Sequence, residues 1–259
     1  MSHFVVLVTN TNEEPLDSQL EPFYEQGDEG DYFMEKDYFL LRDKEEVEKY
    51  LYNEFKNCLI AIKDKKRDEA NKKWWRKEKR IIEKIILEED LDKQISAIQA
   101  YNGGGEDKKG LYWLCNPNAK WDWWTEGGRW NGWLVKKDGT RCNSCLVKEL
   151  DFDGMRKAEM EDAGKYYDAE MARAKENNQK PFFWGFEETP TKEEYMERSN
   201  HLVAPFAVLH DGNWMEKGSM GWWGISDDKY SEEEWSKHFQ EFFSKLDPEM
   251  EVTIVDCHI

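Results

Sequence analysis

The chain has 259 residues, enough for one large domain, and 36% of them are charged. Its 14% aromatic content argues against disorder along the whole length, because disordered segments are poor in aromatic side chains. The formal net charge of −18 disfavours an extended nucleic acid or an anionic membrane as the partner, since like charges repel over a Debye length.

The first hundred residues are predicted to form one buried strand and a long helical insertion. Residues 3–9 (HFVVLVT) are a continuous β-branched and apolar run, which is typical of a strand buried on both faces. An acidic, turn-rich loop follows over residues 10–42. Asp43 and Glu46 then form a capping pattern that begins a helix, and apolar residues recur at helical spacing from there onward.

A basic run interrupts the acidic sequence inside this insertion. Residues 63–80 contain ten Lys or Arg against four Asp or Glu. Such a run is either a solvated helix face that pairs with acidic segments of the same chain or a docking surface for an anionic partner. Both interpretations stay open.

The second part of the chain alternates aromatic strand patterns with charged helices. Residues 111–135 are predicted to form an aromatic β segment with a hairpin through 126–128. A charged helix at 155–180 and a short helix capped by Thr191 come next. The remaining predicted elements are a strand at 205–209, a glycine-kinked return strand at 214–225, a helix beginning at Ser231, and a last strand at 252–259.

These elements predict an α+β fold in a single domain of residues 1–259. We expect an antiparallel sheet, ferredoxin-like in topology, with helices on one side and a charged helical insertion at about 43–101. In that topology the first and last strands are adjacent and antiparallel. His3 would therefore lie near Asp256 and His258.

The strongest local motif is the tryptophan-rich stretch NPNAKWDWW at 116–124. Strand alternation would place Trp121 and Trp123 on one face and Asp122 on the other. The paired glycines of the following GGRWNG motif at 127–132 permit a sharp bend and a close approach to another group. The two indoles are therefore candidates for stacking on a flat ligand.

The GGRWNG motif also places Arg129 directly before Trp130. A planar guanidinium beside an indole suits a phosphate or carboxylate that is carried by a stacked base. A buried ion pair between Asp122 and Arg129 in a tryptophan-lined core explains the same residues without any ligand. Both interpretations stay open.

A second glycine- and tryptophan-rich motif, DGNWMEKGSMGWWG, occupies residues 211–224. Its glycines flank large aromatic residues, as expected where a flat ligand or a neighbouring strand crosses a bare backbone. Trp222 and Trp223 are candidates for ligand stacking, and Glu216 is a candidate base or hydrogen-bond acceptor. Packing in a twisted sheet also explains the pattern and is favoured for any single tryptophan, whereas two such segments in one chain favour a shared pocket.

The two ends of the chain supply two histidines and a carboxylate. His3, Asp256 and His258 could act as acid and base or bind a transition metal, whereas a terminal histidine often only caps a sheet through hydrogen bonds. We predict no metal site, because the sequence does not show three convergent ligands. Cys142 and Cys145 form a lone C-x-x-C without a second pair at zinc spacing, so we interpret them as incidental thiols.

Common catalytic and targeting signals are absent from the sequence. It contains no P-loop, no dinucleotide-binding glycine fingerprint, no G-x-S-x-G and no paired H-x-[ST] motifs, and it identifies no cofactor. No apolar stretch approaches the length that spans a bilayer, and the opening residues lack the basic region of a signal peptide. We therefore expect a cytoplasmic protein with reduced thiols.

Four motifs together resemble a family of uncharacterised proteins encoded by bacteriophages and prophages. They are the opening MSHF, the NPNAKWDWW and GGRWNG pair, the DGNWMEKGSMGWWG stretch and the closing VTIVDCHI, in the same order. The regions 43–100 and 140–200 carry no matching motif. The family commonly has tyrosine and isoleucine where this chain has Trp124 and Glu126. The resemblance implies a phage setting and the cytoplasm of the host cell, and it transfers no catalytic residue.

Accessory phage proteins of this size often counter host immunity, so the resemblance implies a counter-defence role. We expect a binding module that sequesters a small anionic, nucleotide-like ligand in a pocket lined by tryptophan and arginine. The candidate ligand-binding residues are Trp121, Trp123, Arg129, Trp130, Trp222 and Trp223.

Two alternatives remain open. The first is a hydrolase or transferase acting on a nucleotide signal, with His3, Asp122, Glu216, Asp256 and His258 as candidate catalytic residues. The second is a protein that inhibits a host defence component through its acidic surface or through the helices at 43–100. A homo-oligomer is compatible with each of these functions.

Overall fold

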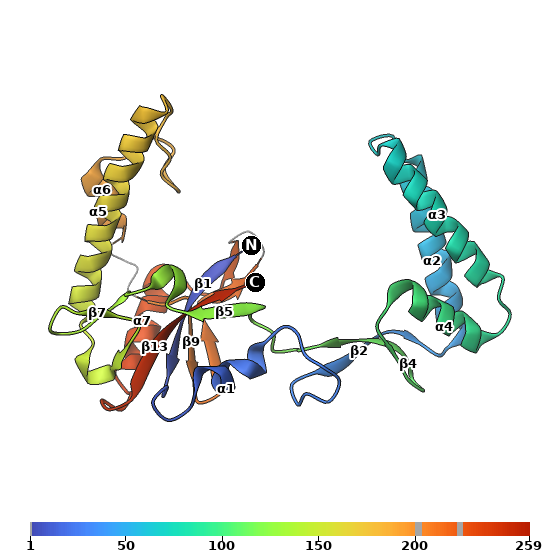
Figure 1. The fold of residues 1–259 in the computed structure, drawn as a ribbon, viewed down its shortest axis with the longest axis horizontal. Helices are drawn as coiled ribbons and strands as arrows, with labels where there is room; N and C mark the ends of the chain where they lie inside the picture. Colours follow the sequence, from blue (N-terminus) through green and yellow to red (C-terminus); the bar gives the residue numbers. More distant parts are fainter. Residues whose placement is uncertain (1, 200–203, 222–224) are drawn as a thin grey trace. The chain divides into compact units, whose positions relative to one another are not determined.

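The computed structural model describes residues 2–199, 204–221 and 225–259. The chain divides into two compact units (Figure 1). The first, the sheet unit, consists of Met1–Tyr24 and Lys120–Ile259, and the second, the helical unit, is Glu25–Ala119. Where we expected one domain with a helical insertion at about 43–101, the inserted segment is longer and has its own small sheet and apolar core.

The sheet unit is built on a six-stranded sheet. Its order is β10 (Asn213–Glu216), β9 (Ala207–His210), β1 (His3–Thr9), β13 (Glu251–His258) and β5 (Trp123–Glu126), and β8 (Ser144–Leu146) also pairs with β13. β1 and β13 are antiparallel neighbours, with His3 opposite His258. This pairing confirms the predicted adjacency of the first and last strands.

The α+β class is confirmed, but the sheet is mixed because β9 pairs parallel with β1. A ferredoxin-like sheet is antiparallel throughout, so that topology is not confirmed. A parallel pair needs a long crossover between its strands. The whole helical unit and a long charged helix lie between β1 and β9 in the sequence, so the connection is long enough.

The predicted hairpin through 126–128 is wrong. β5 pairs with β13, and the chain then enters a short 3-10 helix, η2 (Gly128–Trp130). Gly127 and Gly128 have positive φ angles of 66° and 50°, which turn the backbone out of the strand. The Gly127 N–H donates to the carbonyl of Ile254, so β13 takes the place of the expected return strand.

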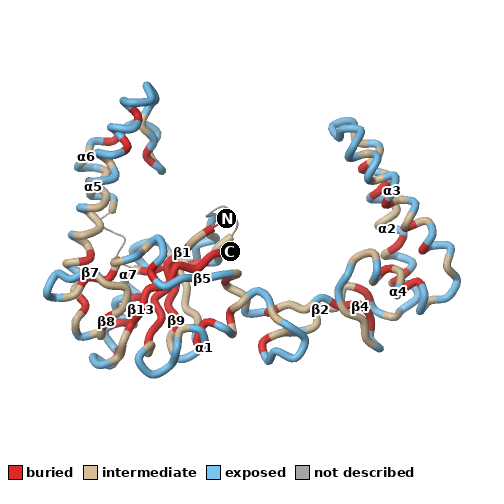
Figure 2. Tube along the Cα trace, viewed as in Figure 1, coloured by how far each residue is buried: buried red, intermediate tan, exposed pale blue. Residues whose placement is uncertain are grey.

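Both faces of the sheet are covered, and strand alternation sorts the side chains between them. The central strands β1 and β13 are buried along most of their length (Figure 2). The α7 face, which packs against helix α7 (Glu232–Phe243), includes Val5, Leu7, Val208, Phe239, Phe243, Val252 and Ile254. The α1 face, next to the short helix α1 (Leu16–Leu20), includes Phe4, Val6, Val8, Leu20, Trp121, Val255 and Cys257. Helices therefore lie on both sides of the sheet and not on one side only.

The predicted helices of the sheet unit form, and two of them begin where their caps indicate. The charged helix is α5 (Phe152–Glu176), and α6 (Lys192–Ser199) begins where Thr191 and Glu194 hydrogen-bond each other. Ser231 and Glu234 form a capping box at the start of α7. The shorter elements are η1 (Glu21–Phe23), β6 (Leu134–Val135), β7 (Arg141–Cys142), η3 (Val147–Glu149), β11 (Gly218–Met220) and β12 (Ser226–Asp228).

The helical unit contains three helices and a three-stranded sheet. These are α2 (Lys44–Lys63), α3 (Glu69–Ile86), α4 (Leu91–Asn102), β2 (Glu35–Leu41), β3 (Gly105–Glu106) and β4 (Gly110–Cys115). The side chains of Asp43, Asp68 and Asp90 each accept backbone N–H groups at a helix start. Within the described residues, no helix is both long and apolar enough to cross a bilayer.

Candidate functional site

Three aromatic rings form a compact triangle at one end of the sheet, because His3 and Trp123 also meet edge to face with centroids 5.2 Å apart. The register pairs His3 with His258 and His258 with Trp123, so that β1, β13 and β5 contribute one ring each. The two imidazole centroids are 4.9 Å apart with their planes at 74°. Trp123 stacks on the His258 ring, with centroids 5.1 Å apart and planes at 17°. Directly opposite residues point to the same face of a sheet, so strand pairing brings the three residues to one face, and the His3 and Trp123 side chains then meet across β13.

Each imidazole is bound by its own carboxylate. Asp256 Oδ1 lies 2.9 Å from His3 Nδ1, and Asp122 Oδ1 lies 2.5 Å from His258 Nδ1. Asp122 stands at the bend before β5, where its backbone N–H donates to the His258 carbonyl. A hydrogen bond at Nδ1 orients an imidazole and leaves its Nε2 available for chemistry. His3, Asp122, Trp123, Asp256 and His258 are called the His–Asp cluster below.

The carboxylate of Asp256 is buried, with the residue 2% exposed. Its Oδ2 accepts the backbone N–H of Arg129 at 3.0 Å, while Oδ1 meets His3. A Cβ on Gly128 would overlap this carboxylate, so only glycine lets η2 cross so closely. A buried carboxylate needs such donors to offset its loss of water, and the GGRW segment supplies one of them.

His258 Nε2 is buried and has no hydrogen-bond partner within the described part of the chain. Buried polar atoms without partners are rare in native proteins, and each one calls for an explanation such as a catalytic role. The His258 side chain is only 5% exposed, whereas Trp123, which stacks on it, is 43% exposed. The cluster therefore lies just below the surface, with Trp123 as its outer layer.

The thiols near the cluster are poor nucleophiles. Cys257 lies between Asp256 and His258 on β13 but packs on the α1 face, where burial raises the pKa of its thiol. Burial also raises the pKa of Cys145 in the C-x-x-C motif to about 12. Among the described residues, no three His, Cys, Asp or Glu side chains converge in a way that could hold a metal ion. The imidazoles and carboxylates of the cluster are the groups equipped for acid–base chemistry.

Four of the five candidate catalytic residues converge in the cluster, and Glu216 does not. The Glu216 carboxylate accepts hydrogen bonds from Lys120 Nζ at 2.9 Å and from Trp214 Nε1 at 2.8 Å. Its strand, β10, lies at the opposite edge of the sheet from β5. Glu216 is therefore not part of this acid–base arrangement.

Trp121 and Trp123 do not share a face, contrary to the prediction from alternation. The chain bends at Asp122 before β5 begins, so the period of two does not continue through it. Trp121 is buried on the α1 face, where it stacks on Tyr24 with centroids 4.7 Å apart. Its indole N–H donates to the Leu20 carbonyl at 3.2 Å. Trp121 is a core residue and cannot stack on a ligand without unfolding.

The other candidate ligand-binding residues are dispersed. Trp130 packs against the core of the α7 face, and Trp222 and Trp223 lie outside the described residues. The buried Asp122–Arg129 ion pair does not form, because Asp122 binds His258 and Arg129 is exposed. Its guanidinium makes no hydrogen bond or ion pair within residues 2–199, 204–221 and 225–259.

Two contacts of the cluster were not predicted. The glycine pair at 127–128 indicated a close backbone approach, but nothing in the sequence identified Asp256 as the group approached. No local signal connects Asp122 with His258, because 136 positions separate them. Both contacts depend on the pairing of β5 with β13.

No protein-family model, curated protein or solved structure matches this chain. The function is therefore inferred from the geometry of the His–Asp cluster and its surroundings.

Proposed function

We propose that the His–Asp cluster is an acid–base catalytic site and that the protein is a hydrolase or transferase acting on a small anionic, nucleotide-like substrate. The observation that carries this proposal is the pair of imidazoles with centroids 4.9 Å apart, each oriented through Nδ1 by a separate carboxylate. Two neighbouring imidazoles can divide the work of a general base and a general acid. Buried ionisable groups cost desolvation, which functional sites tolerate more often than cores do.

In the hydrolysis of a phosphoester, one neutral imidazole accepts a proton from water as the water oxygen bonds to phosphorus. The bond from phosphorus to the leaving oxygen breaks, and the second imidazole, protonated, gives its proton to that oxygen. Exchange of one proton between the rings and solvent restores the starting state. Asp122 and Asp256 stabilise the imidazolium form of the ring that each one binds. In a transferase, an alcohol takes the place of water.

Trp123 of the cluster and Arg129 beside it support an anionic aromatic substrate. Trp123 is 43% exposed and offers an indole surface on which a base can stack. Arg129 is exposed, follows the glycine that crosses Asp256, and has a guanidinium suited to phosphate oxygens. The resemblance to phage proteins supports a counter-defence role, in which the substrate is a nucleotide-derived immune signal.

The test uses chromatography to measure the products formed from a panel of linear and cyclic nucleotides and from bis(4-nitrophenyl) phosphate. We expect His258→Asn to lower kcat/KM by about 10²- to 10⁴-fold, the usual contribution of a general acid or base. The matched control is His210→Asn, because His210 is half-buried and bonds Thr9 at 2.8 Å, away from the cluster. The wild-type pH–rate profile should be bell-shaped.

Two outcomes would contradict the proposal. If His258→Asn turned over the same substrate as fast as the wild type, the cluster would not be catalytic. If a nucleotide quenched tryptophan fluorescence but no product formed from any substrate, the protein would be a sequestering module, and Arg129→Ala should then weaken that binding.

A further inference from the structure

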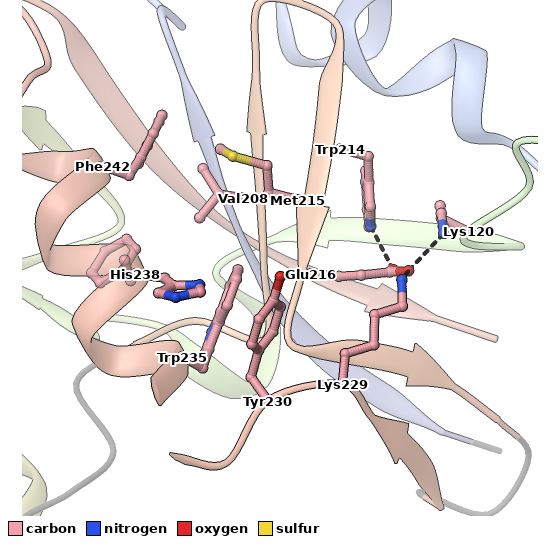
Figure 3. Close-up of a pocket in the computed structure, with 11 residues that line it drawn as sticks. Lys120, Val208, Trp214, Met215, Glu216, Lys229, Tyr230, Trp235, His238 and Phe242 are labelled. Atoms are coloured by element: carbon pink, nitrogen blue, oxygen red, sulfur yellow. Dashed lines mark hydrogen bonds and ion pairs between the residues drawn. The ribbon is translucent and has the colours of Figure 1, made fainter. Parts of the chain in front are cut away.

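A cavity of about 420 Å³ lies between the edge strand β10 and helix α7 (Figure 3). Small-molecule sites usually enclose roughly 300–1,000 Å³, so the cavity has room for a ligand of one or two rings. Its walls come from β10, from Val208 of β9, from α7, from the residues just before α7, and from Lys120. None of the lining residues belongs to the His–Asp cluster.

One side of this cavity carries a local excess of positive charge. Glu216 is held by Lys120 Nζ at 2.9 Å and by Trp214 Nε1 at 2.8 Å, so two donors already satisfy its carboxylate. Lys229 lies farther away, with Nζ 3.8 Å from Glu216 Oε1 and its side chain 63% exposed. Two lysines against one glutamate leave one net positive charge in a chain whose formal net charge is −18.

The other side of the cavity is aromatic. Tyr230 stacks near Trp235, with centroids 6.0 Å apart and planes at 23°, and His238 meets the edge of Tyr230 at 4.7 Å. The Trp235 indole N–H donates to the Pro205 carbonyl at 2.6 Å, which fixes the ring. Phe242 lines the cavity one turn beyond His238 along α7 (Figure 3). Preformed, nearly parallel rings of this kind bind flat ligands at a low entropic cost.

We propose that this cavity is a second ligand site, separate from the His–Asp cluster, and that it binds a planar aromatic anion of the size of a nucleoside monophosphate. The ring of the ligand packs on the half-buried Tyr230, which the buried Trp235 supports from behind, and its anionic group binds Lys229. Lys229 is the cation with the longer contact to Glu216, so it can turn to the ligand while Lys120 stays on the carboxylate. Three strands, β9, β1 and β13, lie between β10 and β5, the strand that carries Trp123 of the cluster. The cavity and the cluster are therefore at different places on the sheet.

The test is titration of the four ribonucleoside 5′-monophosphates into the protein by calorimetry. We expect at least one to bind, more tightly than its uncharged nucleoside does. Lys229→Gln should weaken that binding about fivefold, as the loss of one partly exposed ion pair predicts. The matched control is Lys237→Gln, because Lys237 is an exposed residue of α7 that does not line the cavity.

A second measurement locates the ligand. Bound nucleotide should slow the reaction of His238 with diethyl pyrocarbonate, and Lys229→Gln should reduce this protection at the same nucleotide concentration, which separates this site from the cluster. The proposal is overturned if none of the four nucleotides binds at millimolar concentration. It is also overturned if the Lys229→Gln and Lys237→Gln variants bind the nucleotide equally well, or if bound nucleotide does not protect His238 from diethyl pyrocarbonate.

Discussion

His3 and His258 lie directly opposite each other on β1 and β13, with ring centroids 4.9 Å apart, although they stand at opposite ends of the sequence. Their surroundings differ. The His3 side chain is 11% exposed, whereas the His258 side chain is 5% exposed and stacks beneath Trp123. A substrate that hydrogen-bonds to Nε2 of His258 must therefore move the Trp123 indole away from the His258 ring.

Removing the indole of Trp123 should expose His258. In Trp123→Ala we expect diethyl pyrocarbonate to modify His258 several-fold faster than in the wild type, because nothing then stacks on the ring. Peptide mass spectrometry measures the rate for each histidine. The control is Trp184→Ala, which removes an indole that is 80% exposed. An unchanged rate at His258 would show that Trp123 does not limit access.

Gly128→Ala should destabilise the protein more than Gly139→Ala does. Both glycines have positive φ, 50° and 84°, which costs an alanine about 1–2 kcal/mol. Gly139 has open space around its Cβ position, whereas a Cβ on Gly128 would overlap Asp256. We expect overlap to add about 1–3 kcal/mol. Urea unfolding measures both variants, and equal losses would contradict the close crossing of η2 over Asp256.

Protonation of Glu170 should lower the free energy of unfolding at acid pH. Its buried carboxylate accepts hydrogen bonds from the Arg173 guanidinium and from the Phe182 N–H, and these donors lower the pKa of Glu170 to about 2. A carboxyl whose pKa is lowered by folding stabilises the protein above its ordinary pKa of 4.5, and this stabilisation is lost between pH 4.5 and about 2.

Glu170→Gln should therefore flatten the dependence of the unfolding free energy on pH in that window. Urea titrations between pH 6 and pH 2 measure this dependence. Glu176→Gln, an exposed substitution on the same helix, serves as the control and should keep the wild-type slope. If the unfolding free energies of the two variants depended on pH with the same slope, Glu170 would not contribute to the acid sensitivity.

The buried thiols should react only after unfolding. Burial raises the pKa of Cys145 to about 12 and also raises that of Cys257, so neither forms much thiolate at pH 8. We expect iodoacetamide to label the half-buried Cys115 before it labels the buried Cys145 and Cys257, which should react only in urea. Rapid labelling of Cys145 in the native protein would contradict the packing of β8 on β13.

The parts of the fold with strong local signals could be predicted from the sequence. The β-branched run at 3–9 and the strand predicted at 252–259 correspond to the two central strands, and caps such as Asp43 and Ser231 marked helix starts. Adjacency of the end strands then placed His3 near Asp256, and their side chains meet at 2.9 Å. Period and capping act over a few residues, so a single sequence carries them.

The parts that depend on long-range pairing could not be predicted. The bend at Asp122 sends Trp121 to the opposite face from Trp123, and no residue pattern marks this bend. The parallel pairing of β9 with β1 depends on how a long connection folds back. Trp121 and Arg129 do not line one pocket for the same reason, because Trp121 is buried in the core of the α1 face while Arg129 is exposed.

The place of β13 has a consequence for synthesis on the ribosome. This strand comes last in the sequence and yet pairs with β1, β5 and β8. Until residues 251–258 emerge, β1 keeps an apolar edge without a neighbour on that side, which is the kind of edge that invites aggregation or chaperone capture. The helical unit is contiguous and can fold early, whereas arrival of the final strand completes the sheet and creates the His–Asp cluster in one step.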